Sequence, residues 1–171
     1  METLRVRAAE SVPTWTVLVF SAAILYQVSH WMEHMIQVYQ HAMLGIIISH
    51  SHGALFFLDL EWNHFMFNLL YFAALVLVFF GGMWFTKIRF RTYPLVSVFL
   101  GLSVLVEGWH FLEHSVRLYQ HVLIGCEPCA GILGASVDIV YLHATYNTLT
   151  WILPLTAYLA GGYYRRMWNM L

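Results

Sequence analysis

The strongest constraint on the fold is a histidine-rich pattern that occurs twice inside long apolar stretches. Segments 30–41 and 110–121 share the order His, Glu, His, Tyr, Gln and His, at the same spacing. A second, shorter repeated pattern follows each copy: Asp59, His64 and Asn68 after the first, and Asp138, His143 and Asn147 after the second. The chain therefore contains an internal duplication, and the residues that its two copies share are polar or ionisable.

Composition indicates which solvent surrounds these residues. Hydrophobic residues make up 60% of the chain, charged residues 10%, and the mean hydropathy is +0.67, as is typical of a membrane protein. Four apolar stretches exceed the roughly 20 residues that a bilayer-spanning helix needs. They cover residues 14–44, 60–86, 94–123 and 137–164. We predict an all-α integral membrane protein, a single domain over 1–171 with four transmembrane helices.

The duplication predicts how those four helices are arranged. They should form a bundle from two parallel two-helix repeats, about 14–86 and 94–164. Gly45 and Gly125 occupy matching positions at expected helix ends. Asp59 and Asp138 lie where the second and fourth helices should begin. Either they cap those helices, or they have a metal-binding or proton-carrying role.

The basic residues predict the orientation in the membrane. They precede the first helix, fill the connection between the second and third helices and follow the fourth: Arg5, Arg7, Lys87, Arg89, Arg91, Arg165 and Arg166. The other two connections, 45–59 and 124–136, contain no Lys or Arg. By the positive-inside rule both termini are cytoplasmic. We expect the chain to reside in the plasma or inner membrane.

The duplicated histidines fall on one stripe of each helix, because each residue advances about 100° around a helix. The stripes on the first and third helices hold His30, His34 and His41, and His110, His114 and His121. The second and fourth helices carry i,i+4 pairs: His64 with Asn68, and His143 with Asn147. Because polar groups facing lipid would be very costly, these side chains should converge inside the non-cytoplasmic half of the bundle.

Imidazole nitrogens and carboxylate oxygens together suit iron or copper, and zinc is also possible. Helix bundles build metal sites from such side chains on facing helices. The expected ligands are His30, Glu33, His34, His41, His64, His110, Glu113, His114, His121 and His143. Glu33 and Glu113 are also the expected catalytic residues, as ligands or proton carriers. Asn68 and Asn147 should orient the metal ligands.

We therefore expect a redox enzyme with an iron or copper centre, or a subunit of a membrane oxidase or oxygenase. The histidine content is loosely similar to that of histidine-rich integral-membrane oxygenases and desaturases, although their full motifs are absent. Two alternatives stay open: a haem b protein for electron transfer with two axial histidines, and a metal-ion or proton transporter. The expected partner is the lipid bilayer, with partner subunits or a second copy left open, and no nucleic acid.

The two repeats also differ. Gln37 corresponds to Arg117, which lies four residues after Glu113 and should form an ion pair with it. Gln27 corresponds to Glu107, a polar position to which the sequence assigns no role.

The two outer connections differ more strongly. Cys126-Glu127-Pro128-Cys129 predicts a disulfide in an oxidising compartment, with capture of a soft metal as the alternative. His50 and His52, in the other connection, are expected to be solvated loop residues that could sample an entering metal.

Overall fold

The computed structural model describes residues 9–10, 12–54, 60–86 and 93–171. Their long helices are α2 Thr14–Leu44, α3 Glu61–Thr86, α4 Pro94–Ile124 and α5 Ile139–Gly161. Two short elements, η1 Ile48–His50 and α6 Tyr163–Trp168, complete the described part, which contains no strand. The prediction of an all-helical fold with helices at these four places is confirmed.

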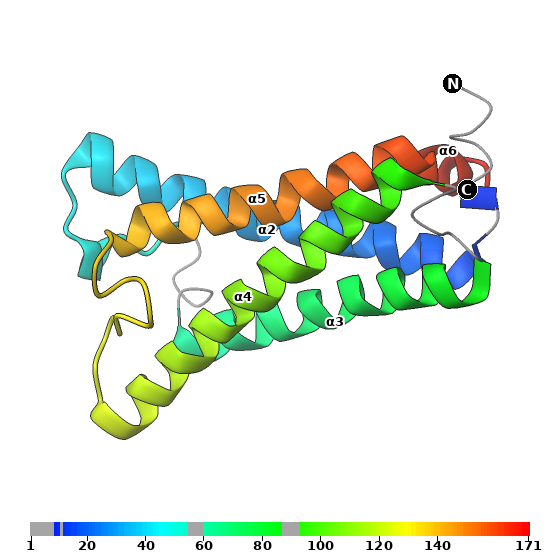
Figure 1. Ribbon diagram of the computed structural model, residues 1–171. Helices are drawn as coiled ribbons and strands as arrows, with labels where there is room; N and C mark the ends of the chain where they lie inside the picture. Colours follow the sequence, from blue (N-terminus) through cyan, green and yellow to red (C-terminus); the bar gives the residue numbers. More distant parts are fainter. Residues whose placement is uncertain (1–8, 11, 55–59, 87–92) are drawn as a thin grey trace.

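The four long helices form a bundle in which each packs against two others. α2 contacts α3 and α5, and α4 contacts the same two helices. Figure 1 shows that α2 and α4 end at the same end of the bundle, where α3 and α5 begin, and that the C-terminus lies at the opposite end. We call the first end the loop end, since the connections 45–54 and 125–138 lie there.

Local chemistry explains where these helices end and begin. Gly45 and Gly125 take the left-handed conformation with φ of 65° and 74°, and each backbone N–H bonds back to a carbonyl of its helix. Glycine reaches this conformation without the steric cost of a Cβ. Asp138 caps α5, because its side chain accepts a hydrogen bond from Val140 N at 2.9 Å. The helix-end and capping interpretations of these residues are confirmed.

Several sequence expectations lie outside the described residues: the capping role of Asp59 and the placement of Arg5, Arg7, Lys87, Arg89 and Arg91.

The interior changes character along the bundle. Toward the end that holds α6, buried apolar side chains dominate: Val17, Phe20, Leu75, Val78, Leu100 and Ala157. Phe20 packs edge-on against Tyr158 and Tyr163, with ring centroids 5.2 and 5.1 Å away. Toward the loop end the buried side chains are mainly histidines, amides and carboxylates. One half of the bundle is thus filled by an ordinary apolar core, and the other by polar groups.

Two of the described helices are long and apolar enough to cross a membrane, α3 over Glu61–Gly82 and α4 over its full length. α2 and α5 do not meet the same criterion, since polar residues of the loop half interrupt their apolar sequence. A helical bundle with two candidate spans is therefore established, and the four-span arrangement stays a prediction.

Candidate metal centre

Six buried histidines from all four long helices meet in the loop half of the bundle. His30 and His34 of α2 join His64 of α3, and we call these three the first triad. The second triad contains His110 and His114 of α4 with His143 of α5. In each triad the imidazole nitrogens, one from each residue, lie within 4.8 Å of one another, and no member is more than 5% exposed. Each repeat therefore builds one triad, with two histidines from its first helix and one from its second.

The two triads adjoin each other. The rings of His64 and His114 stack with their centroids 5.3 Å apart and an interplanar angle of 4°. His34 and His143 also stack across the boundary, at 5.8 Å. The six imidazoles therefore form one continuous cluster, in which pairs of metal ions could sit close together.

The nitrogens of this cluster fit a metal ion. Within the described part of the chain, His30 Nε2, His34 Nε2 and His114 Nδ1 are buried and have no hydrogen-bond partner. Burial of such groups without a partner is costly, and ligation would satisfy the two Nε2 atoms of the first triad. His110 Nε2 and His114 Nε2 lie 3.1 Å apart, close to the spacing of about 3.3 Å that tetrahedral bonds of about 2.0–2.1 Å give. Both triads consist of histidine alone, without a carboxylate.

The two predicted asparagines contact the backbone beside the cluster. Asn68 Nδ2 donates to His64 O at 2.8 Å, and Asn147 Nδ2 donates to His143 O at 3.0 Å. Both asparagines are fully buried. They can therefore fix the helix turn that carries each histidine.

Gln27 and Glu107 lie deeper than the triads and are also fully buried. Gln27 Nε2 donates to Asn147 Oδ1 at 2.9 Å and to Thr150 Oγ1 at 3.0 Å. Glu107 Oε2 lies 3.4 Å from His110 Nδ1, at the limit of hydrogen bonding. Gln27 thus contacts the amide of Asn147, whereas Glu107, at the duplicated position, contacts the metal-ligand candidate His110.

Glu33 and Glu113 face the loops. Glu113 Oε1 accepts hydrogen bonds from the backbone N–H groups of Ile132 and Leu133, at 2.8 and 3.1 Å. The carboxylate of Glu33 lies directly against Gly53, where even a Cβ atom would overlap it. Neither glutamate belongs to a triad. Their ligand or proton-carrier role is untested, and these contacts favour a role in positioning the loops.

A duplicated glutamine completes each loop contact. Gln40 exchanges two hydrogen bonds with the backbone of Gly53, at 2.9 and 3.0 Å. Gln120 does the same with Gly131, at 3.2 and 2.8 Å. The duplication of these glutamines was the sequence signal for this contact with the loops.

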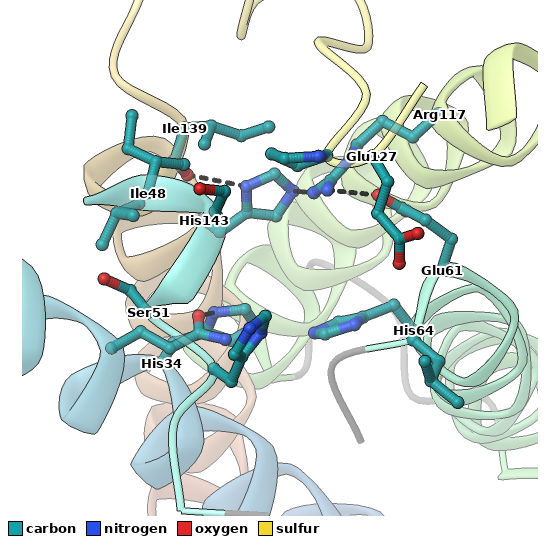
Figure 2. Close-up of a pocket in the computed structure, with 15 residues that line it drawn as sticks. His34, Ile48, Ser51, Glu61, His64, Arg117, Glu127, Ile139 and His143 are labelled. Carbon is teal, nitrogen blue, oxygen red and sulfur yellow. Dashed lines mark hydrogen bonds and ion pairs between the residues drawn. The ribbon is translucent and has the colours of Figure 1, made fainter. Parts of the chain in front are cut away.

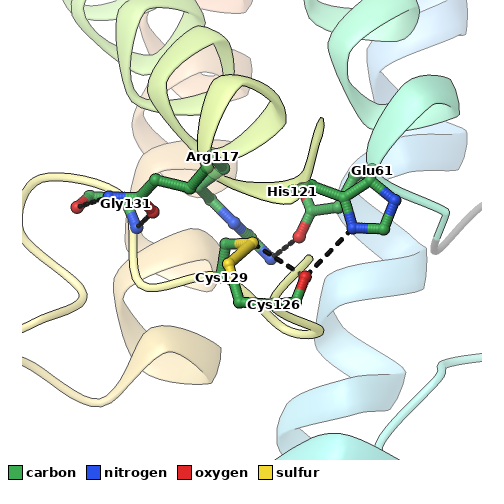
Figure 3. The surroundings of a disulfide bond; sticks show 7 residues. Glu61, Arg117, His121, Cys126, Cys129 and Gly131 are labelled. Carbon is green, nitrogen blue, oxygen red and sulfur yellow. Dashed lines mark hydrogen bonds and ion pairs between the residues drawn. A yellow bond between two sulfur atoms is a disulfide. The ribbon is translucent and has the colours of Figure 1, made fainter. Parts of the chain in front are cut away.

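His41 and His121 hold the loops and lie outside the two triads. The Nδ1–H of His41 donates to Ile46 O at 2.8 Å, and its Nε2 lies 3.1 Å from Asp138 Oδ2. The Nδ1–H of His121 donates to Cys126 O at 3.0 Å (Figure 3). Cys126 and Cys129 form the predicted disulfide, while its oxidising compartment stays a prediction.

The expected ion pair between Arg117 and Glu113 is wrong. Arg117 Nη2 donates to Glu61 Oε1 at 2.5 Å, and its Nη1 donates to His143 Nε2 at 2.9 Å (Figure 2). The physical reason is that backbone N–H groups of the second loop occupy the carboxylate of Glu113. Glu61, at the start of α3, offers Arg117 a buried partner from a neighbouring helix.

A cavity of about 310 Å³ lies between the loops and the histidines. Its lining includes His34 and His64 of the first triad and His143 of the second (Figure 2). Residues of both loops, among them Ile48 and Glu127, line it as well. The cavity therefore connects the loop end with both halves of the cluster. Comparisons with protein families, curated proteins and solved structures find no match for this chain.

Proposed function

We propose that this chain is an integral membrane metalloprotein in which the two histidine triads together hold a paired iron or copper centre. The observation that carries this proposal is the pair of buried triads, each with imidazole nitrogens within 4.8 Å of one another. Imidazoles suit both copper and iron, and a given nitrogen site binds Cu²⁺ more tightly than Fe²⁺, so affinity favours copper of the two. When bound, such metals supply one-electron redox chemistry.

The surface of the bundle supports a membrane location. Large apolar side chains are exposed on all four long helices, including Leu25 at 72%, Phe80 at 59%, Leu105 at 71% and Ile152 at 47%. The polar groups are buried instead, an arrangement that suits lipid better than water. We place the loop end on the non-cytoplasmic side of the plasma or inner membrane, with both termini in the cytoplasm. The reason is that Arg165 and Arg166 of α6 lie at the opposite end, whereas the two connections of the loop end contain no Lys or Arg.

The cavity supports an enzymatic role. It brings His34, His64 and His143 within reach of a small molecule that enters between the loops. Arg117 and Glu61 in its wall neutralise each other, so the cavity carries little net charge from this pair. We propose an oxidoreductase that acts on such a molecule, alone or as a subunit of a membrane oxidase or oxygenase. The histidines hold the metals, and the loops shape access to them.

Two observations argue against the alternatives. Neighbouring imidazole rings of the cluster lie 4.7 to 5.9 Å apart by their centroids, which leaves little room for a haem plane between paired histidines. The apolar core in the other half of the bundle interrupts a polar path through the chain, which disfavours a metal-ion or proton transporter. A directly ligated centre that is reached from one side fits both observations.

Metal analysis and an optical spectrum of the purified full-length chain test the proposal. We expect stoichiometric iron or copper without a Soret band, and loss of metal in both His34→Ala and His114→Ala. Tyr39→Phe and Tyr119→Phe are matched controls on the same two helices, since these tyrosines are 54% and 64% exposed. A Soret band would select haem b instead, and full metal retention in both histidine variants would overturn the assigned ligands.

A further inference from the structure

The two triads differ in how their nitrogens are engaged. In the first triad, the Nδ1–H of His34 donates to Gln37 Oε1 at 2.7 Å, so the lone pair of this ring is on Nε2. His34 Nε2 and His30 Nε2 are both buried and have no hydrogen-bond partner in the described part of the chain. A metal ion can therefore bind these two nitrogens of the first triad without displacing a hydrogen-bond partner.

In the second triad, the Nε2 atoms of all three histidines already have hydrogen-bond partners. The Nδ1–H of His143 donates to Ile139 O at 2.8 Å, so its lone pair is on Nε2, and that nitrogen accepts a hydrogen bond from Arg117. His110 Nε2 and His114 Nε2 bond to each other at 3.1 Å. A metal ion can use His143 only when the guanidinium of Arg117 leaves its Nε2.

Charge adds to this competition. Arg117 is always protonated, and a metal cation held by His143 would lie close to the guanidinium in an interior where charge repulsion is strong. Gln37, at the same position of the first repeat, brings no charge to the first triad. Arg117 can leave His143 while it keeps Glu61, because different nitrogens, Nη1 and Nη2, make the two contacts.

We propose that the triads are unequal metal sites: the first binds metal tightly, and the second binds it more weakly because Arg117 competes for His143. This inference rests on the proposed metal centre and assigns Arg117 as the positioning residue that sets the order in which the two triads are loaded.

Titration of the purified full-length chain with Cu(I) under anaerobic conditions tests this order. Wild type should bind in two steps, and His34→Ala should remove the tighter step. Arg117→Gln recreates the residue of the first repeat and should tighten the weaker step by about 10–100-fold, because a metal ion no longer has to break a hydrogen bond from a charged donor. Arg117→Lys keeps the positive charge and should leave the weaker step within a few-fold of wild type.

Arg117→Gln leaves the buried carboxylate of Glu61 without its cation and can unfold the chain for that reason. The double variant Arg117→Gln/Glu61→Gln removes both charges and should show the same tightening, with thermal unfolding as a check on folding. Two equal steps in wild type, or an unchanged weaker step in the double variant, would overturn the inference and leave the metal centre intact. Absence of any Cu(I) or iron binding by wild type would instead overturn the proposed function.

Discussion

At the scale of single residues, the loop contacts show how the duplication stabilises the site. Gly53 and Gly131 have positive φ angles of 71° and 72°. Each lies directly against a buried glutamate of the preceding helix and exchanges two backbone hydrogen bonds with a glutamine. Two reasons favour glycine at these positions. The backbone conformation is unfavourable for other residues, and a Cβ atom would overlap the glutamate carboxylate. The glutamates Glu33 and Glu113 thereby hold the loops over the cluster.

This dual requirement predicts the effect of Gly131→Ala. A Cβ atom at this position would overlap Glu113 Oε1 and lie 2.9 Å from Arg117 Cγ. Gly125→Ala is the matched control, since Gly125 has a φ of 74° and nothing within 4 Å of an added Cβ. The control should cost about 1–2 kcal/mol for the left-handed backbone alone. Gly131→Ala should cost about 1–3 kcal/mol more, as measured by unfolding in detergent. Equal losses would show that Glu113 yields to the added methyl group.

The residues of the triads were predictable, and the partners of Arg117 were not. Helical periodicity is local, so the spacing of His30 and His34, repeated at His110 and His114, was enough to place these side chains on one stripe of each helix. The partner of Arg117 depends on how α3 and α4 are rotated against each other and on which loop N–H groups reach Glu113. Those are tertiary properties, and the i,i+4 rule behind the expected ion pair does not include them.

At the scale of elements, the start of α5 joins a helix cap to a contact between repeats. Asp138 accepts a hydrogen bond from Val140 N through Oδ1, while its Oδ2 lies 3.1 Å from His41 Nε2. The side chains of His41 and Asp138 are 23% and 33% exposed, so solvent weakens their ion pair. The cap should therefore dominate the contribution of Asp138 to stability.

Asp138→Ala and Asp138→Asn separate the cap from the ion pair. Alanine should lower the free energy of unfolding by about 0.5–2 kcal/mol, whereas asparagine caps a helix about as well as aspartate. We expect the asparagine variant to unfold close to wild type in a thermal melt, and both variants to keep full metal content. If asparagine proved as destabilising as alanine, the contact with His41 would be the important one, and loss of metal would revive the metal-binding role considered for this residue.

The boundaries of most elements were predictable because the residues that set them act locally. The fourth helix is the exception, since its apolar sequence predicted one element over 137–164. The structure ends α5 at Gly161 and starts α6 at Tyr163, with Gly162 at a φ of 74° between them. Tyr163 is 1% exposed and packs against Phe20. The break points the side chain of this tyrosine into the core. Hydropathy along the sequence does not predict the break, because the stabilisation comes from tertiary packing.

At the scale of the whole molecule, the bundle has a polar half toward the loop end and an apolar half toward the end that holds α6. The cavity opens among the loops of the polar half, and the C-terminus lies at the other end. If Arg165 and Arg166 keep that other end in the cytoplasm, the proposed metal centre would be loaded and used from outside. Orientation thus decides which compartment supplies both the metal and the small molecule.

Labelling of single cysteines tests this orientation. Both native cysteines form the disulfide, so unreduced wild type should not react and serves as the blank. Ser49→Cys lies in the first loop, and Leu171→Cys lies at the C-terminus, where the native side chain is 90% exposed. A membrane-impermeant maleimide should label Ser49→Cys on intact cells, and should label Leu171→Cys only after the membrane is permeabilised. The reverse pattern would place the loops and the cavity in the cytoplasm, and the centre would then draw its metal from there.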